Sequence, residues 1–312
     1  MTVPSQELIG TVTAESGIQG QAPLDETAVP SRGRIIVRRF LAQKSALFGL
    51  VLLLILILMA YVGPHVAKWG YEQPDYESFL VTPNSSHWFG TDGTGTDLFA
   101  ATMRGAQKSI LIGLLVAILA TSMAAVVGAT AGYFGKWIDG VLMWIVNLLL
   151  VIPSFLIIAI LSPRFHNNLT LFVVLLGMFI WQITARIVRG QTLSLREREY
   201  VLAAKYMGVS GTRIIFRHIL PNLASLLIID ATVNVSTAVL TETGLSFFGF
   251  GVQPPDVSLG TLIGSYANAA LTYPWQFYFP AASLVVLVLS INLVGDAFRD
   301  ALDPHATGRS AA

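Results

Sequence analysis

The chain has 312 residues, of which 54% are hydrophobic and 12% are charged, and its mean hydropathy is +0.66. Soluble domains carry about 25% charged residues, so this composition predicts a protein embedded in a lipid bilayer. The net charge of +1 argues against a nucleic-acid partner, which would require a strongly basic face. The absence of cysteine excludes disulfides, thiolate catalysis and cysteine-based metal sites.

Residues 1–30 are polar, acidic-leaning and without periodicity, which is typical of a disordered tail. This stretch contains neither a basic residue nor an apolar run, so it lacks the features of a signal peptide. Basic residues gather between residue 31 and the first apolar run. We expect residues 1–44 to form a disordered and basic tail in the cytoplasm.

A helix needs roughly 20 apolar residues to cross the core of a bilayer. Six stretches meet or approach this length, and the fifth is the weakest because Asp230 interrupts it. The pattern predicts an all-α integral membrane protein with six transmembrane helices: one leading helix, an extracytoplasmic segment of residues 63–108 and a five-helix core of residues 109–300. The expected spans are 45–62, 109–133, 141–161, 169–185, 223–240 and 275–294.

The distribution of basic residues predicts the orientation, because lysine and arginine favour the cytoplasmic side. Five of them crowd the entrance to the first span, which places the N-terminus in the cytoplasm. Six crossings then return residues 301–312 to the same side as a short tail. In this arrangement fifteen of the 19 Lys and Arg residues lie inside and four lie outside. Aromatic residues between 273 and 279 fall at the outer end of the last span, where they fit the headgroup region.

The cytoplasmic loop of residues 186–221 contains the most informative stretch, EYVLAAKYMGVSGTRIIFRHILPN at 199–222. The beginning of this stretch favours a helix, and Gly208 can adopt the left-handed conformation that closes one. Ser210 is a suitable N-cap for a second helix of about ten residues, which Pro221 ends where the chain re-enters the membrane. We therefore expect two short helices joined by a glycine elbow.

This hairpin offers two features that suit a docking surface. Ala203 and Ala204 leave one face thin, so that a partner surface can approach closely. Arg213 and Arg217 are one turn apart and form a basic stripe on the second helix. A hairpin that packs on its own bundle and turns its arginines to the inner leaflet explains the same spacing equally well.

The segment resembles the EAA loop of ABC-importer permeases, in which Glu-Ala-Ala, three residues, Gly, nine residues and Ile-x-Leu-Pro follow one another. Residues 202–204, Gly208 and residues 218–221 have that spacing, with Leu202 in place of the glutamate and His218 in place of the isoleucine. Glu199 lies three residues before Leu202 and is our candidate for the missing carboxylate. The resemblance implies a coupling helix that docks in a groove of an ATPase through Glu199, Ala203, Ala204, Gly208, Arg213, Arg217 and Pro221.

Further segments resemble the second, C-type permease of dipeptide and oligopeptide importers in the peptide/nickel family. They cover residues 87–304 in the family's order, and Thr96 stands where arginine is usual. The matching segments are HWFGTD at 87–92, GTD at 95–97, GAQKS at 105–109, LTE at 240–242, LSF at 245–247, GFGVQPP at 249–255, GD at 295–296 and RDALDP at 299–304.

The resemblance implies a type I ABC-importer permease that performs no covalent chemistry and moves dipeptides or oligopeptides across the cytoplasmic membrane. Two related permeases would form the pathway, two ATPase subunits would bind below them, and an extracytoplasmic substrate-binding protein would deliver peptide. ATP and Mg²⁺ would bind to the ATPase chains, and this chain would hold no cofactor. Closure of the ATPases would move the coupling helices and open the spans outward.

Motifs typical of other functions are not present with the spacing that those functions require. The glycines near residues 128–136 do not form a phosphate-binding loop, and the five histidines lack the spacing of metal ligands. The competing hypothesis is a secondary transporter driven by an ion gradient, with Asp230 as its proton or sodium site, but it leaves the hairpin unexplained. The pair Gly128 and Gly132 fits a close approach of two helices and, equally, incidental glycine.

Three residues of the fifth span are candidates for the translocation pathway: Asp230, Asn234 and Glu242. Asp230 and Asn234 are one turn apart and project to one face. An ionised aspartate near the bilayer centre costs roughly 2.5–3.5 kcal/mol, so it should turn towards protein or water. Glu242 lies near the outer end of the span and need not share that face. Asp230 and Asn234 would either meet a passing peptide or bond to another span, and the sequence leaves both open.

Overall fold

The structure, a computed structural model, describes residues 32–165 and 168–302. Within these ranges the chain is helical, and the one β pairing is a single bridge between Thr91 and Asp97. Outside the described residues lie the predicted disordered stretch 1–30, residues 303–312 of the predicted C-terminal tail, and two of the five histidines, His166 and His305.

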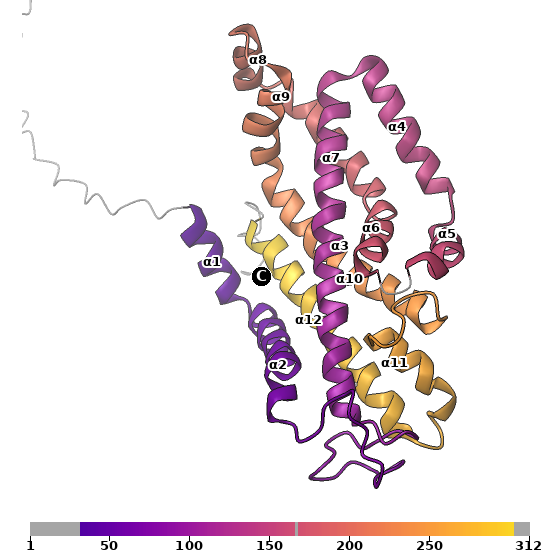
Figure 1. Cartoon of the computed structure of the whole chain (residues 1–312). Coiled ribbons are helices and arrows are strands. Elements are labelled where there is room, and N and C mark those ends of the chain that lie inside the picture. Colours follow the sequence, from indigo (N-terminus) through magenta and orange to yellow (C-terminus); the bar gives the residue numbers. More distant parts are fainter. Residues whose placement is uncertain (1–31, 166–167, 303–312) are drawn as a thin grey trace, which may run out of the picture.

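Twelve α-helices make up most of the part of the chain that the structure describes (Figure 1). Short 3-10 or π turns extend or connect four of them. The α-helices are α1 (Arg32–Ala42), α2 (Lys44–Val66), α3 (Leu98–Phe134), α4 (Lys136–Val151), α5 (Ser154–Leu161), α6 (Leu169–Met178), α7 (Gln182–Leu195), α8 (Glu199–Tyr206), α9 (Gly211–Ile214), α10 (Ala224–Phe247), α11 (Leu259–Tyr266) and α12 (Pro274–Leu302), and the turns are η1 (Ser162–Phe165), η2 (Ile215–Ile219), η3 (Leu220–Leu223) and η4 (Ala267–Ala269).

Four helical segments are each long and apolar enough to cross a membrane: α2, α3, the segment Gly211–Phe247 and α12. Two further pairs of helices pass the same test together but are bent, α4 with α5 by 75° and α6 with α7 by 50°. Counting each bent pair as one span gives the six spans that the sequence predicts. Pro153, directly before α5, accounts for the first bend, since proline has no N–H to continue the hydrogen-bond ladder.

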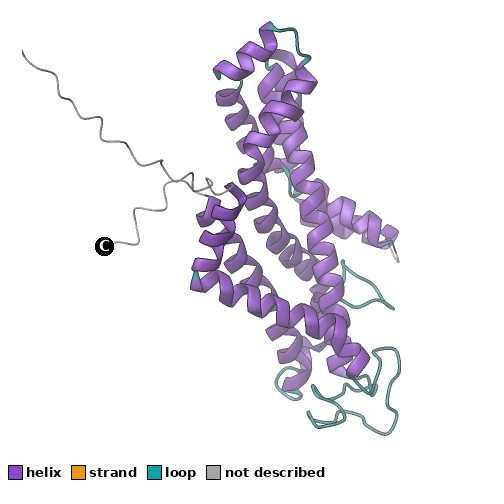
Figure 2. Cartoon of the chain, turned by 90° about the vertical axis from the view of Figure 1, so that its left-hand side faces the viewer, coloured by secondary structure: helices purple, strands orange, loops and turns teal. Residues whose placement is uncertain are grey.

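The bundle has two distinct ends (Figure 1). We call the end with α8 and α9 the hairpin end. The opposite end carries the long connection of residues 67–97 together with α11, and we call it the loop end. Figure 2 shows that the irregular segments gather mainly at the loop end, whereas the hairpin end is almost entirely helical.

Several predicted boundaries differ from the structure. Helix α3 begins at Leu98, so the last eleven residues of the predicted outer segment 63–108 are helical. Asp97 causes the early start, because its side chain caps the helix by accepting a hydrogen bond from the Ala100 N–H at 2.8 Å. The predicted loop 186–221 is also largely helical, since α7 continues to Leu195.

The predicted tail of residues 1–44 is wrong in its second part, which forms α1. Phe40 of this helix is buried, and its ring centroid lies 4.7 Å from that of Phe298 near the end of α12. Apolar packing therefore holds α1 against the end of α12, where the sequence predicted a disordered chain.

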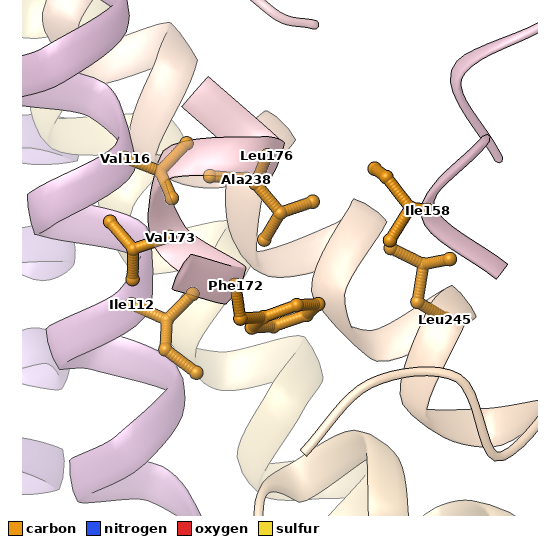
Figure 3. Close-up of a cluster of buried hydrophobic side chains, with 8 residues drawn as sticks. All are labelled: Ile112, Val116, Ile158, Phe172, Val173, Leu176, Ala238 and Leu245. Atoms are coloured by element: carbon orange, nitrogen blue, oxygen red, sulfur yellow. The ribbon is translucent and has the colours of Figure 1, made fainter. Parts of the chain in front are cut away.

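Helix α3 runs through the centre of the bundle and packs against α7 and α10. Its glycines permit this approach: a Cβ on Gly128 would lie 2.5 Å from the Ala185 carbonyl oxygen, and one on Gly132 would lie 2.7 Å from the Thr192 Cβ. The interpretation of these glycines as a site of close helix approach is confirmed. In a different part of α3, Ile112 and Val116 join residues of α5, α6 and α10 in an apolar cluster (Figure 3).

Candidate functional site

A polar cluster lies inside the bundle where α10 passes α3 and α7. Asp230 accepts hydrogen bonds from the hydroxyl of Thr184 at 2.6 Å and from that of Thr121 at 3.2 Å. Asn234, one turn along α10, donates its amide to Asp230 at 2.8 Å and to Thr121 Oγ1 at 3.1 Å. Donors from three helices thus hold the carboxylate, and within the described ranges no lysine or arginine forms an ion pair with it.

Asp230 also borders a cavity of about 480 Å³ between α7, α10 and α12. Arg299 of α12 lines the same cavity and brings a positive charge to walls that are otherwise mainly apolar. The hydrogen bonds to other spans and the exposure to a cavity are both present, so the two interpretations of Asp230 do not exclude each other. The lining residues are Thr184, Ile187, Ser225, Leu226, Ile229, Asp230, Val233, Arg299 and Leu302.

Glu242 does not join this site. Its side chain is completely buried, with an exposed fraction of 0%, and it accepts hydrogen bonds from Ser246 at 2.6 Å and Ser109 at 3.2 Å. The prediction that Glu242 lines a pathway is therefore wrong, because its side chain reaches no surface of this chain. The physical reason is that the carboxylate serves as the acceptor between α3 and α10 at the loop end.

The two serines extend this buried contact to the neighbouring loop. Ser246 Oγ accepts the backbone N–H of Val252 at 3.1 Å, and Ser109 Oγ accepts that of Leu259 at 3.3 Å. Glu242 therefore anchors, through the two hydroxyls, the segment that leads from α10 into α11. The sequence signal was present as the LTE and LSF segments, but the partner Ser109 lies far away in the chain.

At the hairpin end the predicted helix, glycine elbow and second helix are all present. Helix α8 ends at Tyr206, Gly208 has a φ of +79°, and α9 begins at Gly211. Nothing lies within 4 Å of a Cβ placed on Gly208, so the left-handed backbone alone requires glycine there. Ser210 occupies the N-cap position but makes no capping hydrogen bond.

The hairpin's candidate docking residues divide between surface and core. Ala204 is only 3% exposed and packs with Val201 and Ile214 against the bundle, so its small size serves internal packing and no partner can reach it. The remaining candidates lie at the surface or, for Gly208, in an open turn: Glu199, Ala203, Gly208, Arg213, Arg217 and Pro221.

Exposed apolar side chains on the hairpin were missed by the sequence analysis. Tyr206 and Met207, just before the elbow, are 85% and 76% exposed, and Phe216 is 56% exposed. A groove of about 560 Å³ lies between α8 and the end of α3, and its lining includes Phe134 and Lys205, the residue before Tyr206. Large apolar side chains next to a turn glycine were the available signal, because a turn at the tip of a hairpin leaves its flanking residues without internal neighbours.

The predicted end of the second helix at Pro221 is wrong. The chain continues from α9 through the π turn η2 and the 3-10 turn η3 directly into α10. Proline removes one backbone donor, and the wider turn accommodates the loss without breaking the helix. The side-chain amide of Asn222 donates to the carbonyl of His218 at 2.6 Å and so supplies a donor in this region.

The loop end is held together by ionisable side chains that the sequence analysis did not single out. His87 is 2% exposed and lies between Asp97, at 2.8 Å, and Asp75, at 3.4 Å. The ring of Trp69 stacks on that of His87 with centroids 5.6 Å apart. The backbone N–H of Glu77, and also His87, hold the pKa of the Asp75 carboxyl below its usual value.

Two further contacts join distant segments at the loop end. The hydroxyl of Tyr266 in α11 donates to Asp92 at 2.9 Å, and burial together with the Asp92 carboxylate raises the pKa of Tyr266. Asp256 forms ion pairs with Lys108 at 2.6 Å and Arg104 at 3.2 Å, both on α3. The segments 67–97 and 248–273 are therefore one connected surface.

Comparison with known families identifies two matching regions. Residues 124–308 match the binding-protein-dependent transport system inner membrane component, and residues 31–83 match the N-terminal transmembrane domain of oligopeptide transport permease C. Together they cover Thr184, Asp230 and Asn234 of the polar cluster, the hairpin and α2.

Curated relatives cover almost the whole chain. The oligopeptide transport system permease protein OppC of Mycobacterium tuberculosis is 53% identical over 280 residues, which are 89% of this chain and 96% of that protein. A putative peptide permease protein of Brucella suis is 37% identical over 270 residues, 86% of this chain and 89% of the relative. The OppC protein of Bacillus subtilis is 36% identical over 266 residues, 85% of this chain and 87% of that protein.

Among solved structures, a chain of the MetNI methionine ABC transporter in inward-facing conformations has a similar fold. The TM-score is 0.52 at 19% sequence identity, and the match covers 64% of this chain and 95% of the other. This likeness confirms the predicted fold of an ABC-importer permease. From the matched families and relatives, the chain belongs to the family of binding-protein-dependent transport system inner membrane components, as a relative of the oligopeptide transport permeases.

Proposed function

We propose that this chain is the permease subunit of an ATP-driven importer that carries dipeptides and oligopeptides across the cytoplasmic membrane. Its relatives are named as peptide or oligopeptide permeases, and they match this chain over most of its length. In this role the chain guides the peptide between its helices and makes or breaks no covalent bond.

One observation carries the proposal: a single apolar helical segment runs from Gly211 to Phe247. It begins just after the elbow at Gly208 and carries Asp230 near its middle. A displacement of the hairpin would therefore be transmitted along one continuous helix to the polar cluster. This is the mechanical link that an importer driven by a separate ATPase needs.

The hairpin is the proposed docking surface for the ATPase. Tyr206 and Met207 project from it as exposed apolar side chains. The groove between α8 and the end of α3 adds a concave surface to the hairpin end. Exposed aromatic and methionine side chains are enriched at the centres of protein interfaces. Arg213 and Arg217 lie on the exposed side of the following helical turns and supply a basic rim.

Asp230 and Asn234 are the proposed contact of the chain with the peptide. The three donors hold the carboxyl group of Asp230 in place at the edge of the adjoining cavity, where its oxygens can accept a hydrogen bond from a cationic group. A peptide brings such a group in its terminal ammonium or in a basic side chain. Charged side chains inside membrane proteins commonly mark such pathways.

The proposed orientation places the hairpin end and both termini in the cytoplasm. The bias of basic residues supports it, and so do the exposed Lys205, Arg213 and Arg217 at the hairpin end. The loop end would then face a substrate-binding protein outside the cell membrane. The remaining proposed partners are a second, related permease and two ATPase subunits. The ATPase subunits, and not this chain, would bind ATP and Mg²⁺.

The docking proposal is tested by placing a charge on the hairpin's apolar tip. Tyr206→Asp in the intact complex should reduce the retention of ATPase subunits on the purified permease by at least about tenfold, since truncation of a central interface residue costs about 2 kcal/mol or more. Tyr76→Asp at the loop end is the matched control, because Tyr76 is also highly exposed, at 74%. Equal retention of ATPase subunits by the two variants would show that the hairpin is not part of the ATPase interface.

The pathway proposal is tested by removing the charge of Asp230 while keeping its shape. Asp230→Asn should lower the uptake of lysine-containing peptides relative to neutral peptides of equal length in reconstituted vesicles. Thr184→Val is the control, because it removes the 2.6 Å hydrogen bond but leaves the carboxylate. If both variants lose stability but preserve the preference among peptides, Asp230 is a structural residue only.

The ion-gradient alternative has no support among the matched families and relatives. It predicts uptake that persists when ATP is absent and a proton or sodium gradient is supplied, whereas the proposed importer requires ATP. The choice between dipeptides, longer peptides and metal chelates is tested best by measuring which ligands bind to the co-encoded substrate-binding protein.

A further inference from the structure

Helix α1 is attached to the membrane-crossing part of the chain by a very short connection. Gln43 alone separates α1 from α2, and α2 is one of the four helical segments able to cross a bilayer. Figure 1 shows α1 at the end of α2 that lies away from the loop end, next to the end of α12. Because α2 enters the bilayer within a few residues, α1 lies at the level of the lipid headgroups.

One face of α1 is occupied by the chain itself. Phe40 is 8% exposed and packs in an apolar cluster with Ala297 and Ala301 of α12, with Ile36 alongside. Gln43 adds a hydrogen bond to Asp300 at 3.4 Å. These contacts orient the helix, so its opposite face has a defined direction.

That opposite face combines two exposed arginines with two exposed apolar side chains. Arg34 and Arg38 are four residues apart, and so are Val37 and Leu41, which places all four on one side of the helix. Val37 is 57% exposed and Leu41 is 49% exposed. The helix contains no acidic residue that would neutralise the arginines.

This combination matches the boundary between headgroups and acyl chains. Guanidinium groups bind phosphate oxygens in a bidentate manner, and a helix at the membrane surface gains further stability by placing aliphatic side chains among the acyl chains. A face in contact with water alone would leave Val37 and Leu41 exposed without a partner. We propose that the face formed by Arg34, Val37, Arg38 and Leu41 binds anionic phospholipid headgroups.

The absence of cysteine makes a site-specific test direct. Ala42→Cys, at the exposed end of α1, accepts an environment-sensitive fluorophore in the intact transporter complex. The complex is placed in nanodiscs of phosphatidylcholine alone or with phosphatidylglycerol. We expect the emission to move to shorter wavelength when phosphatidylglycerol is present, because binding of its headgroups draws the labelled end of α1 deeper among the headgroups.

The double change Arg34→Gln and Arg38→Gln should abolish most of this shift. Each arginine near an anionic surface contributes roughly fivefold to binding, so the pair should weaken the preference for phosphatidylglycerol by about thirtyfold. Lys68→Gln with Arg164→Gln is the control, since it removes two exposed basic side chains that lie away from α1 and outside the proposed ATPase surface, and it should leave the label's response unchanged.

Two results would overturn the proposal. The first is an emission that is the same in both lipids, or that responds to phosphatidylglycerol equally in the α1 double variant and the control. The second is a shielded label in phosphatidylcholine alone that becomes exposed when partner chains are removed, which would show that protein covers this face. Size-exclusion profiles of both double variants verify that the chain remains folded and assembled.

Discussion

Replacing Glu242 tests the buried contact that joins α3, α10 and the segment leading into α11. The oxygens of Ser109 and Ser246 already accept the backbone N–H groups of Leu259 and Val252, so each hydroxyl hydrogen points to the glutamate. Glu242→Ala leaves both donors buried without an acceptor. An unsatisfied buried donor costs about 1–3 kcal/mol, so we expect a loss of about 2–6 kcal/mol in the free energy of unfolding.

Glu242→Gln keeps an amide oxygen of similar position and should lose about half as much. The 2.6 Å bond to Ser246 is the shorter of the two, so it should carry the larger share. A double-mutant cycle of Glu242→Ala with Ser246→Ala isolates it, and the coupling energy should be about 1–3 kcal/mol, because both changes remove the same bond.

Unfolding in mixed micelles of mild detergent and dodecyl sulfate, followed through the 6 tryptophans, measures these differences. Glu197→Gln is the control, since the Glu197 side chain is 66% exposed and such a surface change should stay within about 0.5 kcal/mol. Unfolding of Glu242→Ala at the same dodecyl sulfate fraction as this control, or additivity in the cycle with Ser246→Ala, would contradict the role of Glu242 as the buried acceptor.

Two further predictions follow from the packing of α3 and from the loop end. Gly132→Leu should lose about 1–3 kcal/mol in the free energy of unfolding, measured in the same assay, because its side chain would meet α7. Gly140→Leu is the control and should show no such loss, since nothing lies within 4 Å of a Cβ at that position. Similar losses in the two variants would contradict the close approach of α3 and α7. The lowered pKa of Asp75 means that its ionised form stabilises the folded loop end above the ordinary value of 3.8, and that this contribution disappears as the pH falls through the lowered pKa. Acid should therefore speed the labelling of a single cysteine at the buried Thr91 relative to one at the exposed Ala203, because the loss of thiolate at low pH slows both alike. Asp75→Asn should flatten the pH dependence of this ratio, and an unchanged ratio would contradict the role of Asp75.

Much of the architecture could be predicted because it depends on local chemistry. A helix needs a minimum apolar length to cross a bilayer, so composition and run length were enough to predict six spans. Gly208 could be interpreted correctly because the left-handed backbone of its turn excludes most side chains whatever surrounds it. The start of α3 could in principle also have been predicted, since Asp97 is a capping residue next to a helix-favouring run.

The failures involve residues whose role depends on a distant partner. Ala204 and Ala203 are adjacent and chemically identical, yet one is buried in the bundle and the other exposed, because the neighbouring helices decide which face is covered. Pro221 has a strong local tendency to end a helix, but the π turn before it and the packing of Ile214 and Ile219 keep the helix continuous.

The membrane-spanning class, the approximate spans and the glycine elbow could be predicted from the amino-acid sequence alone, since each follows from hydropathy or from the backbone conformation of single residues. The roles of the buried acidic groups became clear only from the contacts between helices. Asp230 meets Thr121 and Thr184 beside a cavity, whereas Glu242, on the same helix, is enclosed by serines. The physical reason is that the cost of a buried charge depends on its donors, and these come from helices that lie far apart in the chain.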